Sequence, residues 1–222
     1  MIFRLCFALS LAWAASAFAQ DQPPANLATT GRGAQGGVAR LVLSHQLYAL
    51  GQATKDPLTV LNAARLAATV TLSDTPRARE RTGDAAPISA PNPPAAAQMF
   101  AAAITLATEN EALLDVIDAA QRDVSFAPAV VAVSTASSLS AGQTESWPLA
   151  FFGGSLAEVA ILGNNSGNLD FQITDANGAL ICRDIGPSDT AYCSFYPAEN
   201  GGFLMTVTNT GDAANSYLLL TN

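Results

Sequence analysis

The hydrophobic residues of this chain follow one period before residue 126 and a different period after it. Before that point, apolar side chains recur at the three- and four-residue intervals of an amphipathic helix. After it, short apolar runs alternate with Gly, Asn, Asp and Pro, which favour turns. The pattern predicts an α+β protein of two modules, with a helical domain over 34–125 and a β-sandwich domain over 126–222. Within the helical domain, the stretch 73–91 has no apolar period and is predicted to be a mobile loop.

Four helices are expected in the first module. Asp56 followed by Pro57 is typical of a helix start, in which an N-cap residue precedes a proline in the first turn, and the Asn-Pro pair at 92–93 repeats it. Thr108 and Glu111 have the spacing of a capping box. These signals predict four helices that end at about Gln52, Leu72, Ala107 and Arg122.

Eight strands are expected in the second module. They lie at about 130–133, 146–152, 156–162, 169–174, 180–183, 191–196, 203–208 and 216–221. The Asp-Ala-Asn-Gly sequence at 175–178 is a strong turn between two alternating runs. Eight short strands at this spacing predict a β-sandwich of jelly-roll type.

The start of the chain has the composition of a secretory signal peptide. A basic residue precedes an apolar stretch at 5–15, and a small-x-small cleavage site ends at Ala19. We expect cleavage between Ala19 and Gln20, which removes the signal peptide 1–19 and leaves a flexible mature N-terminus over 20–33. The apolar stretch is shorter than a bilayer-spanning helix, so no membrane span is expected after its removal.

The mature chain would keep two cysteines, Cys182 and Cys193. An even number of cysteines in an exported chain indicates a disulfide. The bridge would connect two consecutive strands of the sandwich. The spacing is not that of a C-x-x-C motif, and no basic residue adjoins either cysteine, so a redox-active pair is not expected.

A series of short motifs in the second module carries a family resemblance. The motifs are Leu139-x-x-Gly142, Glu158-Val159-x-Ile161-x-Gly163, Leu169-Asp170-Phe171-x-Ile173-x-Asp175-x-Asn177-Gly178, Gly202-Phe203-x-x-x-Val207-x-Asn209 and Asn215-x-Tyr217-x-Leu219. Over residues 137–222, the chain resembles the bacterial pre-peptidase C-terminal domain, a jelly-roll module of exported proteins. The resemblance implies a module that is not itself catalytic. No peptidase domain precedes it here, and the helical half resembles no known family.

Charge excludes two classes of partner. The net charge is -8, and the second module carries Arg183 as its single basic residue. Nucleic acids and anionic membranes require clusters of Lys and Arg, so neither is expected as a partner. A protein or a glycan is expected instead. The aromatic side chains of the sandwich are expected to pack in its core, with a glycan-binding face as the alternative; they are Trp147, Phe151, Phe152, Tyr192, Phe195, Tyr196 and Phe203.

The chain has few residues that could carry catalysis. His45 is its single histidine, and its apolar neighbours on a helix predict a partly buried side chain with a local hydrogen bond. Residues 31–36 spell G-x-G-x-x-G, but a dinucleotide site needs a preceding strand, which is not predicted here. A zinc site needs three or four His, Cys or carboxylate ligands, whereas this chain has one histidine and its two mature cysteines are expected to form a disulfide. We therefore assign no catalytic, cofactor-binding or metal residues from the sequence.

Acidic residues leave two alternatives open. Glu111, Asp115 and Asp118 lie on one helical face, with Arg122 four residues after Asp118. Such a cluster is a solvated face with an ion pair or, alternatively, an acid–base pair. Calcium binding is the second alternative, because the sandwich offers oxygen ligands, although turn chemistry explains them equally well. These residues are Asn164, Asn165, Asn168, Asp170, Asp175, Asn177 and Asp184.

Together these features predict a periplasmic or secreted protein without catalysis, which acts as a binding or assembly module. The alternative is an exported hydrolase that uses Glu111 or Asp115 in a cleft between the two modules, because ligand sites favour domain junctions.

Overall fold

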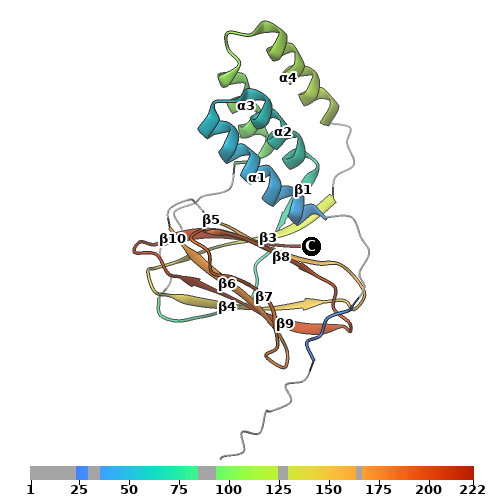
Figure 1. Cartoon of the computed structure of the whole chain (residues 1–222), viewed down its shortest axis with the longest axis vertical. Coiled ribbons are helices and arrows are strands. Elements are labelled where there is room, and N and C mark those ends of the chain that lie inside the picture. The colour runs from blue at the N-terminus through green and yellow to red at the C-terminus, as the bar shows by residue number, and fades with distance from the viewer. Residues whose placement is uncertain (1–23, 30–35, 85–93, 125–129, 164–166) are drawn as a thin grey trace, which may run out of the picture.

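A computed structural model describes residues 24–29, 36–84, 94–124, 130–163 and 167–222. The predicted signal peptide, its cleavage site at Ala19 and Gln20, and most of the glycine motif lie outside these residues. The described part is an α+β fold of three layers, in which four helices sit on one side of a two-sheet sandwich (Figure 1). The helices are α1 (Gly37–Thr54), α2 (Pro57–Ala68), α3 (Ala96–Leu106) and α4 (Glu111–Val124).

All eight strands expected after residue 126 are present. They are β3 (Val130–Leu139), β4 (Thr144–Phe151), β5 (Ala157–Gly163), β6 (Leu169–Asp175), β7 (Leu180–Asp184), β8 (Thr190–Phe195), β9 (Gly201–Asn209) and β10 (Asn215–Thr221). They form two antiparallel sheets, with the orders β3-β10-β5-β8 in sheet A and β4-β9-β6-β7 in sheet B. Successive strands alternate between the sheets except for β6 and β7, which are neighbours in sheet B, and this agrees with the predicted jelly-roll arrangement.

The region between α2 and α3 differs from the prediction. It contains β1 (Val70–Asp74), which pairs in parallel with β3, and β2 (Glu80–Arg81), which pairs antiparallel with β4. Each sheet thus gains a fifth strand from the first half of the chain. Strand residues thus interrupt the predicted loop at 73–74 and at 80–81, whereas 75–79 and 82–84 have no helix or strand, and residues 85–91 lie outside the described part. We call residues 70–84 the crossing segment, because they pass from the edge of sheet A to the edge of sheet B.

The helix boundaries show which local signals were correct. Asp56 caps α2 by accepting a hydrogen bond from the amide of Leu58 (3.0 Å), with Pro57 in the first turn, as predicted. The helix does not continue to Leu72, because the β-branched residues at 70 and 71 begin β1. The capping box is also wrong, since α4 begins one residue after Asn110, whose side chain accepts from the amide of Leu113 (3.1 Å). Asn92 lies outside the described residues.

The two sheets differ in how many of their faces are buried. In sheet A, every residue of β5 and β10 is buried, whereas β6 in sheet B alternates between buried and half-buried residues. The reason is α1, which packs Val38 and Val42 on the outer face of sheet A against Leu162, Leu218 and Leu220. The outer face of sheet B has no helix over it in the described part of the chain (Figure 1). Sheet A is therefore the central layer, between the helices and sheet B.

The disulfide joins the two sheets. Cys182 lies on β7 at the edge of sheet B, and Cys193 lies on β8 at the edge of sheet A. Their Cα atoms are 6.2 Å apart. The bond thus closes one edge of the sandwich covalently, while the crossing segment covers the opposite edge.

Candidate functional site

A cavity of about 470 Å³ lies between the helices and the outer face of sheet A. Ligand sites in proteins commonly have 300–1,000 Å³ and mostly apolar walls. The wall from the helices includes Leu41 and Met99, and the wall from the sheet includes Val70, Leu218 and Leu220. The cavity forms because α1 lies directly on the sheet, whereas α3 is held further out by its packing on α2. The junction expected to hold a ligand therefore does contain a cavity.

His45 contributes the most deeply buried ionisable group in the wall of this cavity. It lies four residues after Leu41 on α1, so both side chains emerge from the same face of the helix. Only 8% of His45 is exposed, and neither Nδ1 nor Nε2 has a hydrogen-bond partner among the described residues. The local hydrogen bond predicted for His45 is therefore wrong. The helix places the ring in the wall, where no neighbouring polar atom reaches it.

Burial lowers the pKa of His45 below its ordinary value of 6.5, because the charged imidazolium loses its hydration. The carboxylate of Asp189 acts in the opposite direction and raises the pKa, but burial has the larger effect. The imidazole is thus neutral at pH 7. A neutral imidazole offers one hydrogen-bond donor and one acceptor.

The buried His45 should make the stability of the protein depend on pH. The unfolded chain binds a proton at this residue below about pH 6.5, whereas the folded chain binds it only at lower pH. The stabilisation is therefore present above pH 6.5 and is lost as the pH falls towards the folded-state pKa. Urea denaturation at pH 7.5 and 5.5 should show a smaller loss of stability for His45→Leu than for the wild type. Equal losses in the two proteins would contradict this expectation.

Ser44 also lines the cavity, but its hydroxyl group is already used. It donates to the carbonyl oxygen of Ala63 on α2 (2.8 Å) and lies 3.4 Å from the sulfur of Met99. Both contacts hold α1 against the neighbouring helices, and the serine is completely buried. A serine that donates its proton to a backbone carbonyl is not poised as a nucleophile. Among the described residues of the wall, Ser44 and His45 are therefore not paired as a nucleophile and a base.

The acidic residues predicted for the alternative hydrolase lie elsewhere. Glu111 and Asp115 are exposed on α4 and do not line the cavity. Asp118 forms an exposed ion pair with Arg122 (2.9 Å), as expected for a solvated helix face. The structure therefore does not bring these carboxylates into the junction.

The predicted calcium ligands that fall in the described part serve turns and strand ends. Asp175 accepts hydrogen bonds from the amides of Asn26, Asn177 and Ala179, each at 2.9 Å. Asp184 accepts from the amide of Gly186 (3.0 Å). No group of three or more His, Cys, Asp or Glu side chains suited to a metal occurs among the described residues. Asn164 and Asn165 lie outside them.

The aromatic side chains mostly pack inside the sandwich. Trp147, Phe195 and Phe203 are buried. The rings of Phe195 and Phe203 are 4.9 Å apart, and Phe151 packs beside them. Phe152 is the exception, because 75% of it is exposed. The expectation of core packing thus holds for Trp147, Phe195 and Phe203.

A buried polar cluster under the crossing segment was not predicted. Glu145 on β4 is completely buried and accepts hydrogen bonds from Arg81 Nε (2.8 Å) and from the hydroxyl of Tyr217. Arg79 contacts the same carboxylate (3.2 Å) and lies over the ring of Trp147, with its guanidinium carbon 5.1 Å from the ring centroid. Burial and the adjacent carboxylate raise the pKa of Tyr217 well above 10. We call these five residues the edge cluster, and it joins sheet A, sheet B and the crossing segment.

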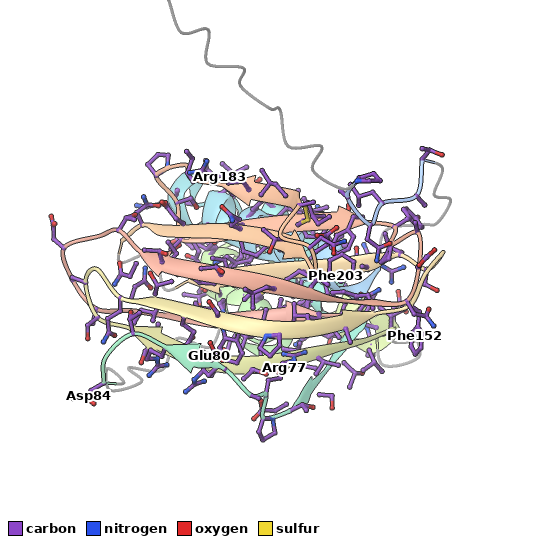
Figure 2. The ribbon with its side chains drawn as sticks, turned by 90° about the horizontal axis from the view of Figure 1, so that it is seen from below. Arg77, Glu80, Asp84, Phe152, Arg183 and Phe203 are labelled. Atoms are coloured by element: carbon purple, nitrogen blue, oxygen red, sulfur yellow. A yellow bond between two sulfur atoms is a disulfide. The ribbon has the colours of Figure 1, made fainter. Side chains whose placement is uncertain are left out.

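Figure 2 shows the sandwich from below, with the crossing segment along one side. Arg77, Glu80 and Asp84 mark the crossing segment along one side, and Arg183 on β7 lies at the opposite side, where the disulfide is. Arg77 donates to the hydroxyls of Thr135 on β3 (2.7 Å) and Thr221 on β10 (2.6 Å). The crossing segment is therefore fastened to sheet A as well as to sheet B.

A second buried carboxylate attaches the helices to the sandwich. Glu158 on β5 accepts from the amide of Gly36, at the start of α1 (3.0 Å), and from the hydroxyl of Tyr192 (2.8 Å). Burial and this contact raise the pKa of Tyr192 to about 12. A carboxylate is favourable at a helix N-terminus, where unpaired amides carry partial positive charge. Gly36, the last glycine of the G-x-G-x-x-G sequence, is thus a structural contact, because a Cβ there would lie 2.1 Å from Glu158 Oε2.

Solved structures that match parts of this chain include a pre-peptidase C-terminal domain, a lysozyme inhibitor and a CBM6 domain. The pre-peptidase C-terminal domain of a collagenase from Bacillus anthracis matches 41% of this chain and 76% of its own chain, with 9% identity and a TM-score of 0.27. The periplasmic g-type lysozyme inhibitor PliG from Aeromonas hydrophila matches 41% of this chain and 86% of its own, with 14% identity and a TM-score of 0.30. The C-terminal CBM6 of a laminarinase from Zobellia galactanivorans matches 37% of this chain and 75% of its own, with 13% identity and a TM-score of 0.25.

The matches include the family that the sequence resembles, and they cover about two fifths of the chain. No family model matches the chain, and no curated protein sequence matches it. Among the described residues, none of the helices has the length and apolar character needed to cross a bilayer.

Proposed function

We propose that this protein is an exported binding protein without catalysis, which holds a small, largely apolar molecule between its helices and its sandwich. The observation that carries the proposal is the cavity of about 470 Å³ beside sheet A, with its apolar walls and the unpaired imidazole of His45. An apolar ligand would remove water from these walls at a gain of about 25 cal/mol per Å² of apolar surface. Ser44, the one serine hydroxyl beside His45 in sequence, is already occupied.

The signal sequence and the disulfide support export. A bond between Cys182 and Cys193 persists in an oxidising compartment, such as the periplasm or the medium. The net charge is -8, and the clustered arginines Arg77, Arg79 and Arg81 already bind side chains of the sandwich. We infer from this that neither nucleic acid nor an anionic membrane is the partner. A protein or glycan that receives or delivers the ligand could bind the outer face of sheet B, which has no helix over it in the described part of the chain.

The cavity can be tested by filling it. Ala136 on β3 lines the cavity and is exposed to it, so Ala136→Trp adds bulk there without overpacking the core. We expect the wild type to bind a neutral apolar reporter, N-phenyl-1-naphthylamine, with a rise in its fluorescence. We expect Ala136→Trp to weaken that binding at least tenfold.

Ala150 provides the matched control. It is an exposed alanine on β4 in the other sheet, and it does not line the cavity. Ala150→Trp should bind the reporter as the wild type does. Equal loss in both variants, or no binding by the wild type, would refute the cavity as the binding site.

A further inference from the structure

Among the described residues that line the cavity, His45 has buried side-chain nitrogens without a hydrogen-bond partner, and an entirely apolar ligand would leave them unpaired. We infer that the ligand carries, beside its apolar body, an uncharged hydroxyl or amide group that pairs with His45. The inference rests on the proposed function and specifies its ligand class.

Burial makes the unpaired state of His45 costly. Buried polar groups in folded proteins almost always have a hydrogen-bond partner, and an unsatisfied one is destabilising. Both ring nitrogens of His45 lack a hydrogen-bond partner among the described residues, although only 8% of the residue is exposed. The ring lines the cavity, so a molecule in the cavity is placed to supply the partner.

The charges around the cavity disfavour an anionic ligand. None of the residues that line it is Lys or Arg, whereas Asp74 lines it and Asp189 acts on His45. A ligand carboxylate would meet like charges and would lose its hydration without a cation to replace it. A ligand ammonium would also lose hydration, and the carboxylate of Asp74 that could receive it is exposed and remains hydrated.

The two ring nitrogens define the head group more closely. Because burial keeps the imidazole neutral, one nitrogen donates and the other accepts. A hydroxyl group and a primary amide each contain a donor and an acceptor, so either can pair with whichever nitrogen faces the ligand. An ether or an ester only accepts and would pair in one tautomer alone.

A set of naphthalene probes that differ in one substituent tests this assignment. The probes are 2-methylnaphthalene, 2-naphthalenemethanol, 2-naphthoate and 2-naphthylmethylammonium, each measured by displacement of N-phenyl-1-naphthylamine at pH 7.5. His45→Leu should weaken binding of the alcohol about five- to tenfold, the value of one hydrogen bond, and should leave the affinity for the methyl compound unchanged. His45→Gln, whose amide also donates and accepts, should restore most of the alcohol's affinity.

The outcomes separate the inference from the proposed function. If the wild type binds the reporter but His45→Leu weakens the alcohol and the methyl compound equally, the head-group assignment is overturned and the cavity stands. If the naphthoate or the ammonium compound loses more affinity than the alcohol in His45→Leu, the head group is charged and the assignment is also overturned. If the wild type binds neither the reporter nor any probe, both proposals fail together. Thermal unfolding of each variant at pH 7.5 establishes that it is folded before binding is measured.

Discussion

Replacing Glu145 with alanine is expected to lower the free energy of unfolding by about 3–5 kcal/mol, the usual cost of removing one partner from a buried ion pair. Glu145 is completely buried and holds Arg81, whose side chain is only 10% exposed. Without the carboxylate, the guanidinium of Arg81 stays in the edge cluster with no opposite charge. Tyr217 loses its acceptor at the same time. Urea denaturation at pH 7.5 measures the change.

Glu80→Ala is the matched control for this effect. Glu80 precedes Arg81 on β2 and is exposed, so its loss should change the stability by no more than about 0.5 kcal/mol. The double variant Glu145→Leu, Arg81→Met should recover part of the loss, because no uncompensated charge remains at that pair. A Glu145→Ala protein as stable as Glu80→Ala would show that the edge cluster does not hold the crossing segment.

Removal of the disulfide is the second large effect that we expect. The Cys182→Ala, Cys193→Ala variant should lose about 3 kcal/mol, because the bond restricts the unfolded chain across a loop with a sequence separation of 11. The bond also joins the edge strands β7 and β8, which otherwise belong to different sheets. Urea denaturation of the oxidised wild type and of the variant gives the difference.

Reduction of the wild type supplies the control for side-chain packing. The reduced protein keeps both cysteine side chains, including the buried Cys193, and differs only in the bond. Its stability should fall to within about 1 kcal/mol of the double-alanine variant. A reduced protein as stable as the oxidised one would mean that the inter-sheet bond contributes nothing to folding.

The strands of the jelly roll could be predicted from sequence because their signals are local. The run Leu169–Asp175 alternates between buried and half-buried residues, and its last residue begins the Asp-Ala-Asn-Gly turn. The runs at 159–162 and 217–220 are continuously apolar, and this carries a signal that the prediction did not use. A strand that is apolar on both faces is covered on both faces. The helix over sheet A could have been inferred from these two strands.

The crossing segment could not be predicted because its partners are remote. Val70 pairs with Val130, and Arg81 pairs with Glu145, and neither pairing leaves an alternation in the segment itself. Most of its side chains are exposed, so composition makes it look like a loop. Its attachment depends on arginines that reach across to buried or half-buried oxygen atoms, and such contacts have no period in the sequence.

The location of the candidate site, between the two modules, was predicted from the sequence, but the residues that line it were not. A junction between modules favours a ligand, and the cavity lies there. The sequence suggested Glu111 and Asp115, because paired acids on a helix are visible as spacing. In the structure, the ionisable residue buried in the cavity wall is instead His45, whose apolar neighbours on α1 were identified from the sequence. The lack of a hydrogen-bond partner for His45 among the described residues depends on the packing of α1 against α2, α3 and sheet A, which sequence spacing does not determine.

The position of the crossing segment also bears on the order of events during synthesis. Arg81 is made 64 residues before Glu145, which at roughly 5–20 residues per second leaves the segment without its partner for roughly 3–13 seconds. An unpaired strand is a site for aggregation during such a delay, and charged residues and proline protect against it. The segment carries Pro76, Arg77, Arg79, Glu80 and Arg81. The arginines that attach the crossing segment to the finished sandwich thus belong to the residue types that protect an unpaired strand from aggregation.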